Sequence, residues 1–217
     1  MDTMVEVIYL LSATLFVVGL KRLQSPATAR AGNAIAAFAM FLAIVATVVD
    51  TEILTWNGIL IGVAIGGLVG GITARRVEMT DMPQLVGIFN GFGGAASALV
   101  AVAEFLGTPT IGVGTTGVTI LIGTAIGGVT FTGSFLAFAK LQGLMTGDPI
   151  TFPGQNILNA LLFLGVLAVG AMTLGAFGGQ DPLTMFYVFC GLAMLMGVLL
   201  VIPIGGADMP VGVSLLN

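Results

Sequence analysis

The sequence contains no histidine and very few charged residues. Only 7% of its 217 residues are Asp, Glu, Lys or Arg, against about 25% in a typical soluble domain. A soluble protein of this length needs polar side chains to cover its surface, so the composition excludes an ordinary soluble enzyme and a disordered chain. The net charge of −4 also excludes a nucleic-acid-binding protein, which needs an excess of basic residues.

Other absences exclude several kinds of chemical site. The one cysteine, Cys190, excludes disulfides and Cys-rich metal sites within the chain. Without histidine, the side chain that most readily titrates near neutral pH is missing. No Walker A, HExxH or strand-turn-helix GxGxxG motif is present. We therefore expect no catalytic residue, no metal ligand and no cofactor-binding residue in this chain.

The sequence is rich in hydrophobic residues (57%) and in glycine (33 residues). A helix crosses the hydrocarbon core of a membrane in about 20 residues. Seven apolar runs are long enough: 4–20, 33–49, 57–74, 83–105, 113–139, 156–177 and 182–204. An eighth run begins at Pro210 and has too few residues to cross before Asn217. We therefore predict an all-α polytopic transmembrane helix bundle, with seven complete spans and a truncated eighth, and a longer parent protein.

The basic residues predict the orientation of these spans. All six flank or lie in the first, third and fifth loops: Lys21, Arg22, Arg30, Arg75, Arg76 and Lys140. The second, fourth and sixth loops contain no Lys or Arg. Because cytoplasmic loops carry the excess of basic residues, the odd loops are predicted to be cytoplasmic and the N-terminus outside.

Glycines recur within the predicted helices, partly as an internal repeat. Residues 59–67 (ILIGVAIGG) and 120–128 (ILIGTAIGG) differ at one position. Glycines four residues apart occur in both regions: Gly62, Gly66 and Gly70 in the first, Gly123 and Gly127 in the second. Small residues at this spacing let helix backbones approach closely in lipid, so we expect these glycines to pack helices.

A second repeat places polar residues at equivalent points of two helices. The tripeptide Asp-Met-Pro occurs at residues 81–83 and 208–210, and an asparagine follows each Asp by nine residues, at Asn90 and Asn217. Proline suits a first helical turn, and an Asp before it can cap the helix. Each asparagine then lies about 10 Å into the membrane, where an amide needs a partner or water. The two amides either fix packing by interhelical hydrogen bonds or share a polar site.

Polar side chains also form stripes on two predicted helices. On residues 83–105, Asn90 and Ser97 share a face with small residues, and on 113–139 Thr130 and Ser134 share a face. Hydroxyl groups in membrane helices often bond back to their own backbone, so each could be purely structural. Two facing stripes together with Asn217 could instead hold a chain of waters.

Three segments resemble a known family. VEMTDMPQLVGIFNGFGG (77–94), GGVTFTGSFLAFAKLQG (127–143) and IGGADMPVGVSLLN (204–217) look like the membrane part of the beta subunit of proton-translocating nicotinamide nucleotide transhydrogenase. The resemblance implies an enzyme that transfers hydride from NADH to NADP+ while protons flow inward. Residues 1–217 would form a single transmembrane proton-translocation domain in the bacterial inner membrane, without the family's last helix and NADP(H)-binding domain.

The resemblance also implies partners. Alpha chains would supply the NAD(H)-binding domain and further membrane helices, and two alpha–beta units would form a dimer. NADP(H) would bind the domain that follows this segment, so no cofactor is expected within it. This segment would hold much of the proton path and none of the hydride chemistry.

The family assigns roles to several positions. Polar residues at the positions of Asn90, Ser134 and Asn217 are implicated in proton conduction, and Ser97 and Thr130 join them here through the stripes.

Two acidic positions and one departure from the family pattern complete the prediction. The position of Asp208 lies near the docked NADP(H) domain, so Asp208 and its repeat equivalent Asp81 are candidates for coupling. Many members carry histidine where this chain has Asn90, so the titrating group is expected on an alpha-chain helix. The alternative function is a secondary transporter of a small solute or ion, with a site at helix breaks near the midplane.

Overall fold

The computed structural model describes residues 3–50, 56–108, 112–176 and 178–216, apart from the side chain of Asp50. Every regular element in these residues is a helix, which confirms the all-α prediction. The chain divides into two compact units, Met1–Ala74 and Arg75–Asn217. Each is described by itself, and the single domain predicted for 1–217 stays a prediction.

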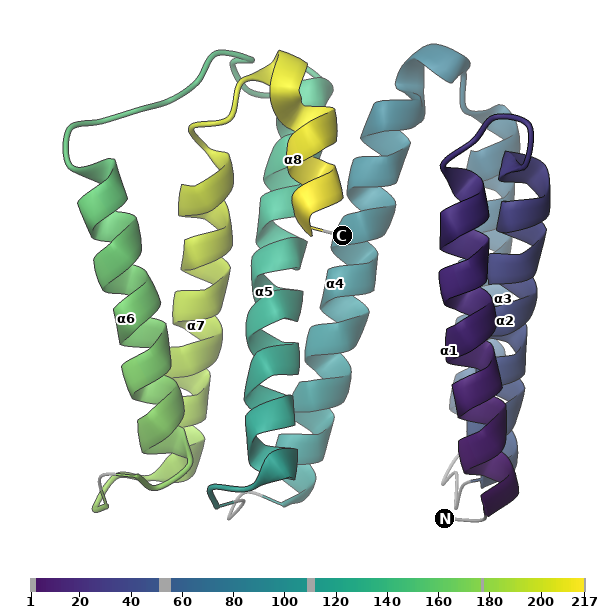
Figure 1. Ribbon diagram of the computed structural model, residues 1–217. Helices are drawn as coiled ribbons and strands as arrows, with labels where there is room; N and C mark the ends of the chain where they lie inside the picture. Colours follow the sequence, from purple (N-terminus) through teal and green to yellow (C-terminus); the bar gives the residue numbers. More distant parts are fainter. Residues whose placement is uncertain (1–2, 51–55, 109–111, 177, 217) are drawn as a thin grey trace. The chain divides into compact units, whose positions relative to one another are not determined.

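The first unit contains a tight helical hairpin. Helices α1 (Thr3–Leu23) and α2 (Ala29–Asp50) lie side by side (Figure 1). They approach so closely that a Cβ atom on Gly32 would lie 2.7 Å from the carbonyl oxygen of Gly19. The hydroxyl of Tyr9 donates a hydrogen bond to Thr47 Oγ1 at 2.9 Å, across the hairpin. Glycine is required at this crossing because any larger residue would strike backbone atoms.

The third helix, α3 (Trp56–Arg76), carries the first copy of the nine-residue repeat. None of its residues is buried. A Cβ atom on Gly62, Gly66 or Gly70 would meet no other atom within 4 Å in the described part of the chain. The predicted role of these three glycines in helix packing therefore stays a prediction.

The second unit is built around one central helix. In Figure 1, α5 lies between α4 and α7, α6 packs beyond α7, and the short α8 lies along one half of α5. Its helices are α4 (Met82–Gly107), α5 (Thr115–Leu141), α6 (Gln155–Thr173), α7 (Pro182–Val201) and α8 (Met209–Leu216). Short 3₁₀ turns, η1 (Met79–Asp81) and η2 (Gly206–Asp208), precede α4 and α8. α5 is the most buried span because neighbours cover it on several sides.

Seven described helices are long and apolar enough to cross a membrane, as predicted. Four predicted ends differ from the observed ones by three or four residues. α1 ends at Leu23 rather than 20, and α2 begins at Ala29 rather than 33. α6 ends at Thr173 rather than 177, because Gly175 adopts a left-handed conformation (φ 80°) and Ala176 N–H bonds back to Ala171. α7 ends at Val201 rather than 204, because Pro203 has no N–H to continue the helix.

Apolar packing holds α8 in place despite its length. Met209 and Val213, one turn apart, are 0% and 3% exposed. They pack with Ala137 of α5 and Val201 of α7 in one hydrophobic cluster. This cluster lies at the Leu141 end of α5, so α8 runs alongside the half of α5 that carries the predicted polar residues.

Candidate functional site between helices α4, α5 and α8

The backbones of α4 and α5 meet at two glycines. A Cβ atom on Gly94 would lie 2.8 Å from Thr130 Cβ, and one on Gly127 would lie 2.6 Å from the backbone nitrogen of Ala98. A Cβ atom on Gly123 would lie 3.4 Å from Ala101 Cβ. The predicted packing role of Gly123 and Gly127 is confirmed. This close approach brings short polar side chains on the two helices within hydrogen-bonding distance.

Asn90 and Ser134 form the central contact of the site. The amide nitrogen of Asn90 donates to Ser134 Oγ at 2.9 Å. Ser134 is fully buried and Asn90 half-buried. Asn90 is eight residues along α4 from Met82 and Ser134 is seven before Leu141, so both lie about 10–12 Å from the helix ends by helical rise. The amide therefore finds its partner on the facing stripe, and its depth in the membrane stays a prediction.

Thr130 joins the site from the next turn of α5. Its hydroxyl donates to the backbone carbonyl of Leu216 at 3.0 Å, and the residue is 6% exposed. Leu216 lies in the last described turn of α8. Three helices therefore contribute polar groups within the one turn of α5 between Thr130 and Ser134. Asn217 lies outside the described residues, and its place in the site stays a prediction.

Ser97 is not brought into this group. Its side chain is exposed on α4, two turns from Asn90, and makes no hydrogen bond among the described residues. The predicted stripe is used mainly for packing, because its members Gly87, Gly94 and Ala101 are buried. A pathway role for Ser97 stays a prediction.

The two Asp-Met-Pro motifs form the same local structure. Each Asp ends a 3₁₀ turn, and the following Met begins a helix. Both carboxylates, of Asp81 and Asp208, are exposed. Asp81 occupies the N-cap position of α4, yet its side chain accepts no capping hydrogen bond. The simple capping interpretation therefore fails for Asp81, and neither carboxylate has a side-chain partner among the residues that the structure describes.

Sequence reasoning missed one buried cation. Lys140, used above only to predict orientation, is 4% exposed. Its ammonium group donates to three backbone carbonyls, of Asp148, Ile202 and Ile204. A lysine at the end of a span normally extends to the membrane surface. No local signal could have found this arrangement, because two of its carbonyls lie more than 60 residues away in sequence.

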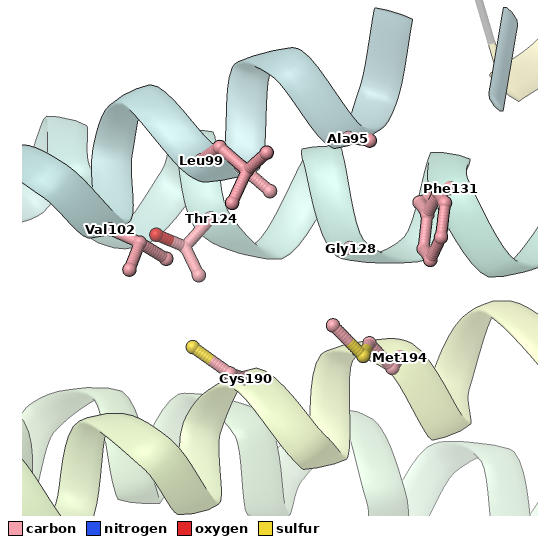
Figure 2. Close-up of a pocket in the computed structure, with 9 residues that line it drawn as sticks. Ala95, Leu99, Val102, Thr124, Gly128, Phe131, Cys190 and Met194 are labelled. Atoms are coloured by element: carbon pink, nitrogen blue, oxygen red, sulfur yellow. The ribbon is translucent and has the colours of Figure 1, made fainter. Parts of the chain in front are cut away.

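A cavity of about 180 Å³ lies on another side of α5, between α4 and α7. Its wall consists mainly of Ala95, Ala98, Leu99, Val102, Gly128, Phe131 and Met194. Figure 2 shows Thr124 from α5 and Cys190 from α7 extending towards the space between the helices. A buried water needs two to four polar partners, and these two side chains are the only polar ones on this wall. The cavity does not extend the polar site.

Comparison with known proteins identifies the family. The model of the NAD(P) transhydrogenase beta subunit matches residues 5–217. The NAD(P) transhydrogenase subunit beta of Rhodospirillum rubrum is 40% identical over 216 residues, covering 96% of this chain and 46% of the relative. The same protein from one strain of that species gives the same values. The chain thus spans about half the length of the curated relatives it matches. It is a multi-pass membrane protein that belongs to the NAD(P) transhydrogenase beta subunit family.

Proposed function

We propose that this chain forms the membrane proton-translocating part of a transhydrogenase, coupling inward proton flow to hydride transfer from NADH to NADP+. The observation that supports the proposal is the contact of Asn90 with Ser134, beside the contact of Thr130 with the α8 carbonyl. Buried polar groups from three helices are costly within lipid unless they form hydrogen bonds with one another or with water. Hydride transfer takes place on soluble domains, with NADP(H) and NAD(H) bound outside residues 1–217.

The chemistry of these side chains suits proton relay rather than proton storage. Asn90 uses one amide hydrogen on Ser134, which leaves its carbonyl oxygen to accept from water. The Ser134 hydroxyl accepts from Asn90 and keeps its own hydrogen to donate. A hydrogen-bonded chain of this kind passes a proton when water joins it, but neither group titrates near neutral pH. The group that holds the proton therefore belongs to a partner.

We assign that group to an alpha-subunit helix facing Asn90. The alpha subunit contributes this helix and the NAD(H)-binding domain, and two alpha–beta units assemble in the bacterial inner membrane. Replacing every membrane-facing His, Asp and Glu of the alpha subunit in reconstituted enzyme tests the assignment. Full proton translocation in that multiple variant would refute it.

The test of the path itself uses the complete alpha–beta enzyme in proteoliposomes. Asn90→Leu and Ser134→Ala each remove one partner of the central contact, and we expect coupled proton translocation to fall about tenfold or more, a barrier increase of about 1.4 kcal/mol. Thr119→Val is the matched control, because the Thr119 hydroxyl bonds back to Thr115 of its own helix. Translocation by both path variants at the control rate would contradict the proposal.

Asp208 is proposed to couple the path to the nucleotide. It is exposed and directly precedes α8, so a docked NADP(H) domain could move that helix and alter the site. Asp81 offers the same contact at the start of α4. Asp208→Asn should uncouple the redox state of the nucleotide from proton uptake. If only the amount of folded enzyme falls, Asp208 has a structural role alone.

The alternative of a secondary transporter has less support. Such transporters place solute sites where membrane helices are interrupted near the midplane. The described spans α1 to α7 are each assigned as one uninterrupted helix. No observation in the described residues therefore favours a solute site.

A further inference from the structure

Lys140 is the buried charge that the proposed path does not use. It lies one residue before the end of α5 and is almost fully shielded from solvent. Its Nζ atom donates to Ile202 O at 2.7 Å, Ile204 O at 2.9 Å and Asp148 O at 3.2 Å. An ammonium group has three hydrogens to donate, so all three are used on backbone oxygens. A buried ammonium is retained only where such partners compensate its lost hydration.

The three carbonyls belong to two segments that are distant in sequence. Asp148 lies in the loop after α5, whereas Ile202 and Ile204 lie in the linker between α7 and η2. These segments also bond directly, because Ile150 N–H donates to Ile202 O at 3.2 Å and Gly206 N–H donates to Gly147 O at 2.7 Å. We name Lys140, Asp148, Ile202 and Ile204 with their hydrogen bonds the Lys140 clasp. The clasp ties the end of α5 to the chain that leads into α8.

The clasp is linked to α8 by side-chain packing. A Cβ atom on Gly212 of α8 would lie 3.2 Å from Ile204 Cδ1, so the residue whose carbonyl binds Lys140 also packs against α8. One turn before Lys140, Ala137 packs in the cluster that buries Met209. α5 thus holds α8 at three successive levels: through the clasp, through Ala137 and through Thr130.

We propose that Lys140 is a positioning residue that fixes the register of α8 against α5. It thereby sets where Leu216 of α8 meets Thr130. The consequence for transport rests on the proposed function, whereas the register itself does not. Because the clasp holds the linker just ahead of Asp208, it fixes the position from which α8 starts. Loss of the clasp should loosen the site without removing any polar group from it.

The experiment compares Lys140→Met and Lys140→Arg in the complete alpha–beta enzyme in proteoliposomes. Met has similar length but no donor, whereas Arg keeps charge and donors. For the register readout, spin labels at Ile122 of α5 and Val211 of α8, both exposed, report their separation by pulsed electron paramagnetic resonance in a background without other cysteines. Lys21→Met, at the exposed end of α1, is the matched control for losing a lysine.

We expect Lys140→Met to broaden or shift the distance distribution between the two labels. Translocation per folded enzyme should fall about tenfold, as for a site misplaced by a fraction of an ångström, with KM for both nucleotides unchanged. Lys140→Arg should recover the distance and at least about a third of the rate. If the Met variant does not accumulate, Lys140→Gln, which keeps a donor on a shorter side chain, replaces it with the same expectations. An unchanged distance and rate per folded enzyme would overturn the proposal, even if the yield falls.

A parallel measurement separates this inference from the proposed function. If Asn90→Leu translocates normally while Lys140→Met shifts the label distance, the positioning role stands and the proposed path fails. If Asn90→Leu blocks translocation while Lys140→Met changes neither distance nor rate, the path stands and the positioning role fails.

Discussion

Three threonines on α5 show how one residue type serves different purposes in a membrane helix. Thr119 bonds back to its own backbone, whereas Thr130 bonds the end of another helix. Thr124 is 2% exposed, and its hydroxyl has no hydrogen-bond partner in the described structure. It faces an apolar cavity that offers little to water. At this residue the structure therefore carries the full cost of a buried, unpaired hydroxyl.

Thr124→Val should stabilise the protein. Valine has nearly the same shape, and an unsatisfied buried hydroxyl costs about 1 kcal/mol or more, so we expect the free energy of unfolding to rise by about 1 kcal/mol. The repeat supports the substitution, because Val63 occupies the equivalent position in α3. Thermal unfolding in detergent measures the change. Translocation should be unaltered, and a lower melting temperature would show that the hydroxyl has a partner in the assembly.

Asp181 is the N-cap of α7, and its stabilising effect should depend on pH. Its carboxylate accepts from the backbone N–H and the hydroxyl of Thr184, and these hydrogen bonds lower the pKa of the carboxyl. A lowered pKa in the folded state means that the stabilisation is present above the unfolded value, near 3.8, and is lost as pH falls through the folded value.

Asp181→Ala should therefore melt at a lower temperature than the parent protein at pH 7. The difference should shrink as the pH is brought below about 4. Thermal unfolding at a series of pH values checks this. A difference that stays constant down to pH 3 would mean that the charged carboxylate is not what caps α7.

Which site residues could be predicted depends on the range of the interactions that place them. Asn90 and Ser134 could be predicted because an amide or hydroxyl within an apolar span must find a partner. The helical periodicity of about 3.6 residues shows on which face of the helix each side chain lies. Lys140 could not be predicted, because its burial is created by carbonyls of Ile202 and Ile204 that arrive through tertiary folding. The sequence pattern predicts on which face of a helix a residue lies, but it does not predict which distant backbone segment packs against the end of that helix.

At the scale of elements, the nine-residue repeat occurs in two different environments. In α5, Gly127 packs against α4, and a Cβ atom on Gly128 would lie 3.4 Å from Ala193 Cβ of α7. In α3, the equivalent Gly66 and Gly67 have no atom within 4 Å of a Cβ position in the described structure. The sequence of an element therefore permits close packing, while its neighbours decide whether the packing occurs.

This pair provides a matched experiment. Gly127→Ala would place its Cβ atom 2.6 Å from two backbone atoms, Ala98 N and Gly94 O, so α4 and α5 must separate. We expect a loss of about 2 kcal/mol in the free energy of unfolding, with weakened translocation, because overpacking between rigid backbones is costly. Gly66→Ala is the control in the same local sequence, and alanine favours the helix there. A Gly127→Ala variant as stable as the parent protein would contradict the observed crossing, whereas a loss in Gly66→Ala equal to that in Gly127→Ala would show that α3 is covered in the assembled enzyme.

Helix extents were predicted well where hydrophobicity decides them and less well where backbone conformation does. The run 83–105 lies within the observed helix α4, and the run 113–139 differs from α5 by two residues at each end. The end of α6 was placed four residues too late, because the run stays apolar beyond Thr173 while Gly175 turns the chain. Hydropathy predicts which residues favour lipid, but it does not predict the residue at which helical hydrogen bonding stops.

At the scale of the molecule, the basic residues predict on which side of the membrane the loops of both units lie. Within the second unit, the loop after α5 lies against the linker after α7, because Ile150 N–H bonds Ile202 O. Both are odd-numbered connections, so this contact agrees with the predicted sidedness. The first unit contributes the loop after α1, flanked by Lys21 and Arg22. The positive-inside rule predicts that this loop lies on the same side of the membrane.

Single cysteines in a Cys190→Ala background test this arrangement across both units. Ser25 lies in the loop after α1, Leu144 in the loop after α5 and Gln180 in the loop after α6, and all three are exposed. Each cysteine variant is treated with a membrane-impermeant maleimide, first on spheroplasts and then after permeabilisation. We expect the cysteine at 180 to react at once and those at 25 and 144 only after permeabilisation, because basic flanks retain their loops in the cytoplasm. Four helices, α2 to α5, separate these two loops, and an even number of crossings puts both on one side. Labelling of 25 and 144 from opposite sides would mean that one of the four, most readily α3, which has no buried residue, does not cross the membrane.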